Sequence, residues 1–100
     1  MESKTYFVSV HPDATQKLVE HLEFLALVSE VAAEKLYQSY EETLSFLANS
    51  PESCPTYPPN PRYRCKLFGR RYRVVFEVVG NVIYADDIQD CRQDTDKNLV

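Results

Sequence analysis

Residues 62–79 decide the fold, and they read Arg62-Tyr63-Arg64-Cys65-Lys66-Leu67-Phe68-Gly69-Arg70-Arg71-Tyr72-Arg73-Val74-Val75-Phe76-Glu77-Val78-Val79. The first part alternates cationic and apolar side chains with a period of two, which is the period of a β-strand. Gly69-Arg70 suits a two-residue turn, and the stretch from Arg71 to Val79 is rich in β-branched and aromatic residues. The segment therefore predicts a β-hairpin.

The same segment is the most basic part of an acidic chain. Residues 62–73 carry six Lys or Arg and no acidic residue, whereas the rest of the 100-residue chain carries five basic and fifteen acidic residues. The net charge of −4 therefore hides a local basic patch. Such asymmetry favours an acidic or polyanionic partner at one place on the surface.

The two-residue turn makes a specific prediction about the faces of this hairpin. It sets Lys66 opposite Arg73, and it places Arg64 and Arg62 on the same face. The other face holds the side chains that we expect to pack on helices, namely Tyr63, Cys65, Leu67, Tyr72, Val74 and Phe76. The cations then lie on the face of the sheet that the helices leave uncovered, here called the open face. Like charges opposed across a ladder cost roughly 0.2–1 kcal/mol, which a bound anion such as phosphate would offset. The alternative is that these charges only keep a strand face soluble.

The elements on either side of the hairpin follow from periodicity. Residues 4–10 alternate as a strand does, and Pro12 suits a helix start. Apolar residues spaced by three or four predict helices over about 12–28 and 30–49, with Ser29 as the cap of the second. Residues 50–61 carry five of the six prolines and predict a stiff loop. Gly80-Asn81 marks a second turn, and a strand from Val82 to about Gln89 follows.

The element order is thus β-α-α-β-β-β, which predicts an α+β fold with two layers. We expect an αα-hairpin packed on one face of a mainly antiparallel four-stranded sheet. A chain of 100 residues predicts a single domain over residues 1–100. Its 44% of hydrophobic residues is enough for one packed core and too much for disorder.

The sequence predicts a reduced, cytoplasmic protein without a metal or a cofactor. Cys54, Cys65 and Cys91 are odd in number and form no C-x-x-C pair, and neither His11 nor His21 lies at zinc-ligand spacing from them. The first residues lack the features of a signal peptide. No apolar run approaches the ~20 residues that a membrane helix needs.

Three further features give weaker signals. His11 and His21 are more typical of a cap or a surface position than of a site. An acidic run near the end of the chain could hold Mg²⁺ but lacks a fixed spacing, so a solvated strand end is the simpler interpretation; it comprises Asp86, Asp87, Asp90, Asp94 and Asp96. Tyr84 falls on the cationic face by parity, where it could stack on a base or simply cover the sheet.

Several short motifs resemble the RelE/ParE toxin superfamily, and the resemblance spans nearly the whole chain. They are the opening Tyr6–Ala14, Tyr63-Arg64, Arg71–Val78, Val82-Ile83-Tyr84 and Ile88–Asp94. The resemblance implies the toxin component of a bacterial type II toxin–antitoxin pair, a growth inhibitor with a role in plasmid stabilisation. A small cognate antitoxin would neutralise it. Members of the superfamily act either as mRNA interferases, typically on the ribosome, or as inhibitors of DNA gyrase.

The resemblance also implies site residues. Arg73 matches the arginine that RelE-like members use in the middle strand, and Arg92 matches the one near the end of their last strand. Arg64 and Lys66 match cationic donors of the preceding strand. In a metal-independent endoribonuclease such cations would orient the scissile phosphate and stabilise its developing charge. The candidate catalytic residues are Arg73, Arg92 and Lys66, and the candidates for binding phosphate or a partner are Arg64, Lys66, Arg73 and Tyr84.

The chain departs from RelE-like nucleases after Arg92. Those enzymes often place a tyrosine or histidine shortly after this arginine, whereas Gln93–Val100 contains neither and is acidic, which would repel RNA. The departure favours a ParE-like action on gyrase or a member without nuclease activity. The alternative outside the family is a non-toxic binding module whose basic patch grips an acidic protein segment. On the family reading, Arg73→Ala and Arg92→Ala are expected to remove activity and leave folding intact.

Overall fold

The computed structural model describes residues 5–92 of the chain. A short strand, β1 (Phe7–Val10), leads into two long helices, α1 (Pro12–Val28) and α2 (Glu30–Asn49). A 3₁₀ turn, η1 (Pro51–Ser53), and a loop then precede three strands, β2 (Arg64–Phe68), β3 (Tyr72–Val79) and β4 (Val82–Asp90). The predicted order β-α-α-β-β-β is confirmed, and both helices have the predicted bounds.

Local capping explains why the two helices begin and end where they do. His11 precedes α1 and accepts a hydrogen bond from the backbone N–H of Asp13, while Pro12 occupies the first helical position. Ser29 serves both helices: its backbone N–H donates to the carbonyl of Leu25, and its Oγ accepts from the N–H of Ala32 at 3.1 Å. A single residue therefore joins the helices into a hairpin.

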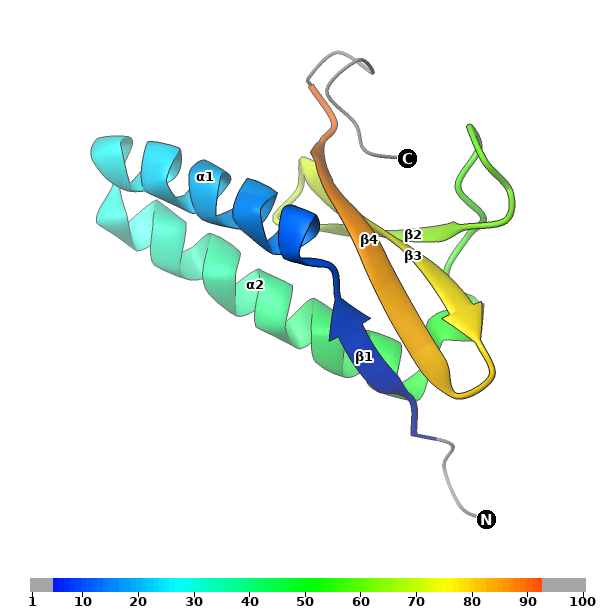
Figure 1. The fold of residues 1–100 in the computed structure, drawn as a ribbon. Helices are drawn as coiled ribbons and strands as arrows, with labels where there is room; N and C mark the ends of the chain where they lie inside the picture. The colour runs from blue at the N-terminus through cyan, green and yellow to red at the C-terminus, as the bar shows by residue number, and fades with distance from the viewer. Residues whose placement is uncertain (1–4, 93–100) are drawn as a thin grey trace.

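The sheet has the strand order β1-β4-β3-β2, and the helical hairpin covers one of its faces (Figure 1). The pairs β2–β3 and β3–β4 are antiparallel, whereas β1 runs parallel to β4. The two helices carry the chain from β1 to β2 at the opposite edge of the sheet, and β3 and β4 then return so that β4 lies beside β1. The end of the hairpin projects well beyond the sheet (Figure 1).

The core lies between the helices and the sheet, as expected for two layers. Its largest contributions come from the inward stripes of the helices and from alternate residues of the strands. The principal members are Leu18, Leu36, Tyr40, Leu47, Phe68, Tyr72, Val74, Phe76, Ile83 and Ile88.

The β2–β3 turn is one residue longer than the sequence predicts. Gly69 and Arg70 both have positive φ, at 58° and 72°, but Phe68 pairs with Tyr72, so Arg71 also belongs to the turn. A change of one residue in the register moves every side chain of a strand to the opposite face.

The predicted pairing of Lys66 with Arg73 is therefore wrong. Lys66 pairs with Val74, and Leu67 is the residue opposite Arg73. Lys66 and Arg64 share the side of β2 that carries the core residue Phe68, while Leu67 is 61% exposed. The cations of β2 and the arginine of β3 consequently lie on different faces of the sheet.

Strand β4 carries a bulge at Asp86. Phe76 pairs with Ala85 and Val75 pairs with Asp87, so no residue of β3 lies opposite Asp86. Because of this extra residue, Asp87 shares the face of Val75, whereas Ile88 shares that of the core residue Val74.

The proline-rich loop covers part of the sheet face that the sequence predicts to be open. The ring of Tyr57 is fully buried there, and its hydroxyl accepts a hydrogen bond from Gln89 at 3.0 Å. The loop is also attached to the edge of β2, since Tyr57 N–H donates to the carbonyl of Tyr63 and Cys65 N–H donates to that of Pro55. The interpretation of this whole face as open is therefore wrong.

Candidate functional site

Arg73, a predicted catalytic residue, is half-buried on β3. Its Nε donates a hydrogen bond to Oε1 of Gln89 at 2.6 Å, and its guanidinium carbon lies 4.9 Å from the centre of the Tyr57 ring. Gln89 is the residue directly opposite on β4. These contacts hold the guanidinium in one orientation, and its terminal nitrogens make no hydrogen bond within residues 5–92. Arg73 thus ties the loop to the sheet and still offers donors to an anion.

Gln89 connects Arg73 to a buried chain of polar groups. Its Nε2 donates to the hydroxyl of Tyr57 and, at 2.8 Å, to Oδ2 of Asp87. The other carboxylate oxygen of Asp87 accepts from Nζ of Lys17 on α1 at 2.7 Å. Because buried polar groups are costly without partners, this chain stabilises the covered face of the sheet. No local pattern of the sequence predicts this chain, because its members lie up to 70 positions apart.

Arg64 and Lys66 are engaged elsewhere. Arg64 donates from Nη1 to the backbone carbonyl of Cys54 at 2.6 Å, and Nζ of Lys66 lies 4.5 Å from the centre of the Phe46 ring on α2. Lys66 and Arg73 nevertheless line a common hollow of about 420 Å³ between β2 and the proline-rich loop. The structure therefore brings two of the four predicted cations to one cavity, from opposite sides of the β2 edge.

Arg92 lies at the far end of β4, with Asp90 as its partner. Its backbone N–H donates to Oδ1 of Asp90 at 2.9 Å, and its Nε lies 3.6 Å from the same oxygen. Asp90 pairs with Tyr72, which belongs to the core side of the sheet, whereas Gln89 and Arg73 lie on the other side. Arg92 is thus separated from Arg73 by the sheet.

The structure places a histidine and a tyrosine beside the partner of Arg92. The rings of His21 and Tyr72 meet edge to face, with their centres 5.0 Å apart. Burial lowers the pKa of His21, although the nearby Asp90 carboxylate opposes this shift. Burial also raises the pKa of Tyr72, and Asp90 adds to that rise. The sequence by itself favours a surface or capping position for His21, because the packing of α1 on β4 is not visible in it.

Tyr84, the predicted stacking residue, is exposed in the middle of the sheet. It lies opposite Glu77 on β3 and Ser9 on β1. Glu77 forms an ion pair with Arg62, with Nε and Oε2 3.1 Å apart. Arg62 lies in the loop before β2, and it reaches Glu77 through its side chain and not as a partner in the strand ladder. The neighbour of Tyr84 on β3 is therefore Glu77, whose charge is neutralised by Arg62, and not an unpaired cation of the described residues 5–92.

The remaining titratable groups add no second cluster. Within residues 5–92, no three His, Cys, Asp or Glu side chains are grouped so that they could hold a metal ion, and Asp94 and Asp96 lie outside this range. The described cysteines are free thiols, and burial raises the pKa of both Cys54 and Cys65. Of the helices described, neither is long and apolar enough to cross a membrane.

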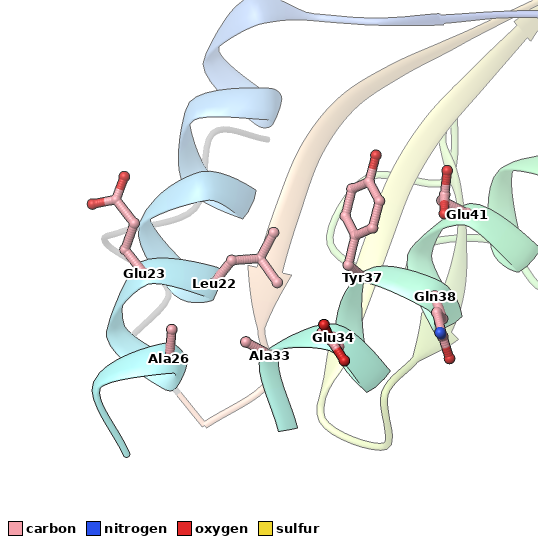
Figure 2. Close-up of a pocket in the computed structure, with 8 residues that line it drawn as sticks. All are labelled: Leu22, Glu23, Ala26, Ala33, Glu34, Tyr37, Gln38 and Glu41. Atoms are coloured by element: carbon pink, nitrogen blue, oxygen red, sulfur yellow. The ribbon is translucent and has the colours of Figure 1, made fainter. Parts of the chain in front are cut away.

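The outer side of the helical hairpin carries an acidic groove of about 600 Å³ (Figure 2). Leu22 of α1 points toward Tyr37 of α2 across its floor (Figure 2). Glu23, Glu34 and Glu41 lie around it. The helices as a whole carry seven acidic and two basic residues, so this side of the molecule repels nucleic acid.

The fold is that of the RelE/ParE superfamily, and a family model described as the ParE toxin of the type II toxin–antitoxin system parDE matches residues 8–95. The chain belongs to this family. It is therefore a toxin component of a type II system, and a cognate antitoxin is its implied partner.

A solved structure supports the fold assignment. The chain is similar to one titled "Chromosomal ParDE TA system from P. aeruginosa", with a TM-score of 0.72 and 20% sequence identity. The match covers 88% of this chain and 98% of that chain. The search of curated proteins returned no match.

Proposed function

We propose that this ParE-family toxin stops growth by binding DNA gyrase and does not cut mRNA. The observation that carries the proposal is the separation of the predicted cations. Arg73 is bonded to Gln89 on one face of the sheet, Arg64 is bonded to Cys54 at the sheet edge, and Arg92 pairs with Asp90 at the far end. Phosphoryl chemistry uses several cations converging on one phosphate, whereas only Lys66 and Arg73 of the four predicted cations line a common cavity.

The charge of the surface supports the same proposal. Affinity for RNA is dominated by neutralisation of phosphates, and it falls when acidic groups surround the contact. Here the helical hairpin is strongly acidic, and the eight residues after Arg92 contain two Asp, one Lys and no Tyr or His. The negative charge of this surface is therefore more compatible with a protein target than with an mRNA bound to the ribosome.

A second candidate function is mRNA cleavage at the Arg92 end, and one observation favours it. His21, whose pKa is lowered by burial, lies in the surroundings of Asp90, the residue to which Arg92 is bonded. A neutral imidazole near a cation is a suitable general base. The predicted catalytic roles of Arg73, Arg92 and Lys66 belong to this second candidate.

One experiment separates the candidates. The chain is expressed from an inducible promoter, and growth, induction of a DNA-damage reporter and primer extension on cellular mRNA are followed together. We expect growth arrest, DNA damage and intact transcripts, and we expect the purified chain to inhibit gyrase in a supercoiling assay. Cleaved transcripts without DNA damage would favour the nuclease. Normal growth with abundant folded protein would instead favour a non-toxic binding module.

We further propose that toxin and antitoxin meet in the cytoplasm, where gyrase acts. Co-expression of the open reading frame next to the toxin gene is expected to restore growth. Co-purification of the two chains on a tag carried by the antitoxin measures the complex directly. A neighbouring protein that restores growth without binding the chain would contradict direct neutralisation.

A further inference from the structure

The turn between β2 and β3 lies directly on the helical hairpin and forms a pocket with it. The N–H of Gly69 donates to Oγ of Ser39 on α2, and a Cβ atom on Gly69 would come within 2.5 Å of Leu36 Cδ1. Beside this close contact is a hollow of about 410 Å³, here called the turn pocket. Its principal residues are Leu25, Lys35, Leu36, Arg70, Arg71 and Tyr72.

The rim of the turn pocket is cationic. Lys35 from α2 and Arg70 and Arg71 from the turn are exposed, and none of them forms an ion pair with a residue in the described range 5–92. Three neighbouring cations without an acidic partner repel one another, and an incoming anion relieves that repulsion. The rim of the turn pocket therefore favours the binding of a negatively charged group, although the rest of the helical hairpin is acidic.

The floor of the turn pocket is apolar. Leu25 and Leu36 from the two helices and the ring of Tyr72 form it, and a side chain as large as Leu or Phe fits the volume. Toward the end of the hairpin, which projects beyond the sheet (Figure 1), four further large apolar side chains are 61–87% exposed. They are Phe24, Leu27, Val28 and Val31. Exposed apolar surface of this kind is typical of protein interaction sites.

From this combination we infer that the turn pocket binds an acidic peptide segment of a partner protein that also carries large apolar side chains. Carboxylates of the segment bind Arg70, Arg71 and Lys35, and a Leu or Phe side chain fills the floor. A nucleic acid matches the cations but not the apolar floor, and the seven acidic residues of the helices repel its phosphates. The inference goes beyond the proposed function, since it holds whether or not gyrase is the target.

The test measures peptide binding by the full-length chain, made by cell-free synthesis so that toxicity does not interfere. The probe is a fluorescein-labelled peptide that alternates Asp or Glu with Leu and Phe, and binding is followed by fluorescence anisotropy. Two matched peptides replace either the acidic residues with Lys or the apolar residues with Ser. We expect both replacements to weaken binding about tenfold or more, because charge and apolar contact are both required.

Variants locate the site. The double variant Arg70→Asn and Arg71→Gln removes two charges, and Asn tolerates the positive φ of position 70. It is expected to bind the acidic peptide about tenfold more weakly, because each exposed charge pair contributes roughly threefold. The matched control Arg62→Gln removes a cation that is paired with Glu77 outside the pocket, and it is expected to bind as the unmodified chain does.

Two further tests are a variant that reverses the charge of a pocket residue and an RNA probe that competes for the same cations. Arg71→Glu is expected to gain affinity for the Lys-containing peptide, which a merely destabilised variant would not do. Circular dichroism confirms that each variant is folded. The inference is overturned if Arg62→Gln weakens binding as much as the pocket variant, if the acidic peptide does not bind, or if labelled poly(U) RNA binds more tightly through the same arginines. These outcomes are read without a growth or gyrase assay, so they are independent of the proposed function.

Discussion

Arg73 and Gln89 face each other across β3 and β4, and a hydrogen bond of 2.6 Å joins the guanidinium Nε to the amide oxygen beneath the ring of Tyr57. Through this bond, Arg73 joins a chain of buried polar groups that runs from Gln89 through Asp87 to Lys17 of α1. A residue that resembles a catalytic arginine is thus also a structural one. Substitutions at position 73 consequently need a stability measurement before any loss of activity is interpreted.

Arg73→Ala is expected to destabilise the fold by about 1–3 kcal/mol, because it leaves a buried acceptor of Gln89 without its partner. The sequence alone predicts intact folding for this variant, because the bond to Gln89 is not visible in it. Urea unfolding followed by circular dichroism measures the change. Arg71→Ala is the matched control, because Arg71 is an exposed turn residue, and its effect is expected to stay within about 0.5 kcal/mol. Equal midpoints for the two variants would contradict a structural role of Arg73.

Lys17→Met is expected to cost about 2–4 kcal/mol of unfolding free energy. The substitution keeps the apolar stem of the side chain but leaves the fully buried carboxylate of Asp87 without its cation. Lys35→Met removes an exposed lysine from the other helix and serves as the control, with an expected effect near zero. Both variants are compared by thermal and urea unfolding. If Lys35→Met were the more harmful, the ion pair would not be a main support of the covered face.

The stability of the chain is expected to fall between neutral pH and mildly acidic pH because of His21. Burial lowers the pKa of His21 below its ordinary value of 6.5, so the unfolded chain takes up a proton at a higher pH than the folded chain. The stabilisation is complete above pH 6.5 and is lost as the pH falls toward the lowered pKa of the folded state. Urea midpoints measured across this window for the unmodified chain and for His21→Gln check it. An unchanged pH slope in His21→Gln would assign the dependence to other groups.

Gly69→Ala is expected to be more harmful than Gly80→Ala, although both glycines have positive φ, at 58° and 62°. Each substitution costs about 1 kcal/mol for the left-handed backbone. At Gly69 the new methyl group would also lie 2.5 Å from Leu36, whereas at Gly80 it meets nothing within 4 Å. We expect an additional loss of about 1–2 kcal/mol at position 69 from this overlap. Equal losses in thermal unfolding would mean that the turn moves away from α2 at little cost.

Much of the fold could be predicted from local patterns. The bounds of both helices followed from apolar spacing, from Pro12 at a helix start and from Ser29 as a cap, because these signals act within one or two turns of the chain. The element order and the two-layer arrangement followed from the same patterns. The parallel pairing of β1 with β4 was not specified, since it depends on how the hairpin carries the chain across the sheet.

The candidate site was predicted less well, and two single residues account for the difference. Arg71 belongs to the β2–β3 turn, which moves Arg64 and Lys66 to the side of the core, and Asp86 forms a bulge, which turns Asp87 to the covered face. Both changes alter the register by one residue. Periodicity gives the alternation within a strand but not the register between strands, because turn geometry and packing decide it.

The sequence by itself determined the elements, the concentration of cations in residues 62–73, and the resemblance that the family match over residues 8–95 confirms. These are properties of neighbouring residues, and they depend on short-range sterics and hydrophobic periodicity. Only the tertiary structure decided where each cation acts: Arg73 on Gln89, Arg92 on Asp90, and Arg70 and Arg71 at the turn pocket. The physical reason is that a side chain's partner is set by contacts between distant segments, which form only when the loop and the helices close over the sheet.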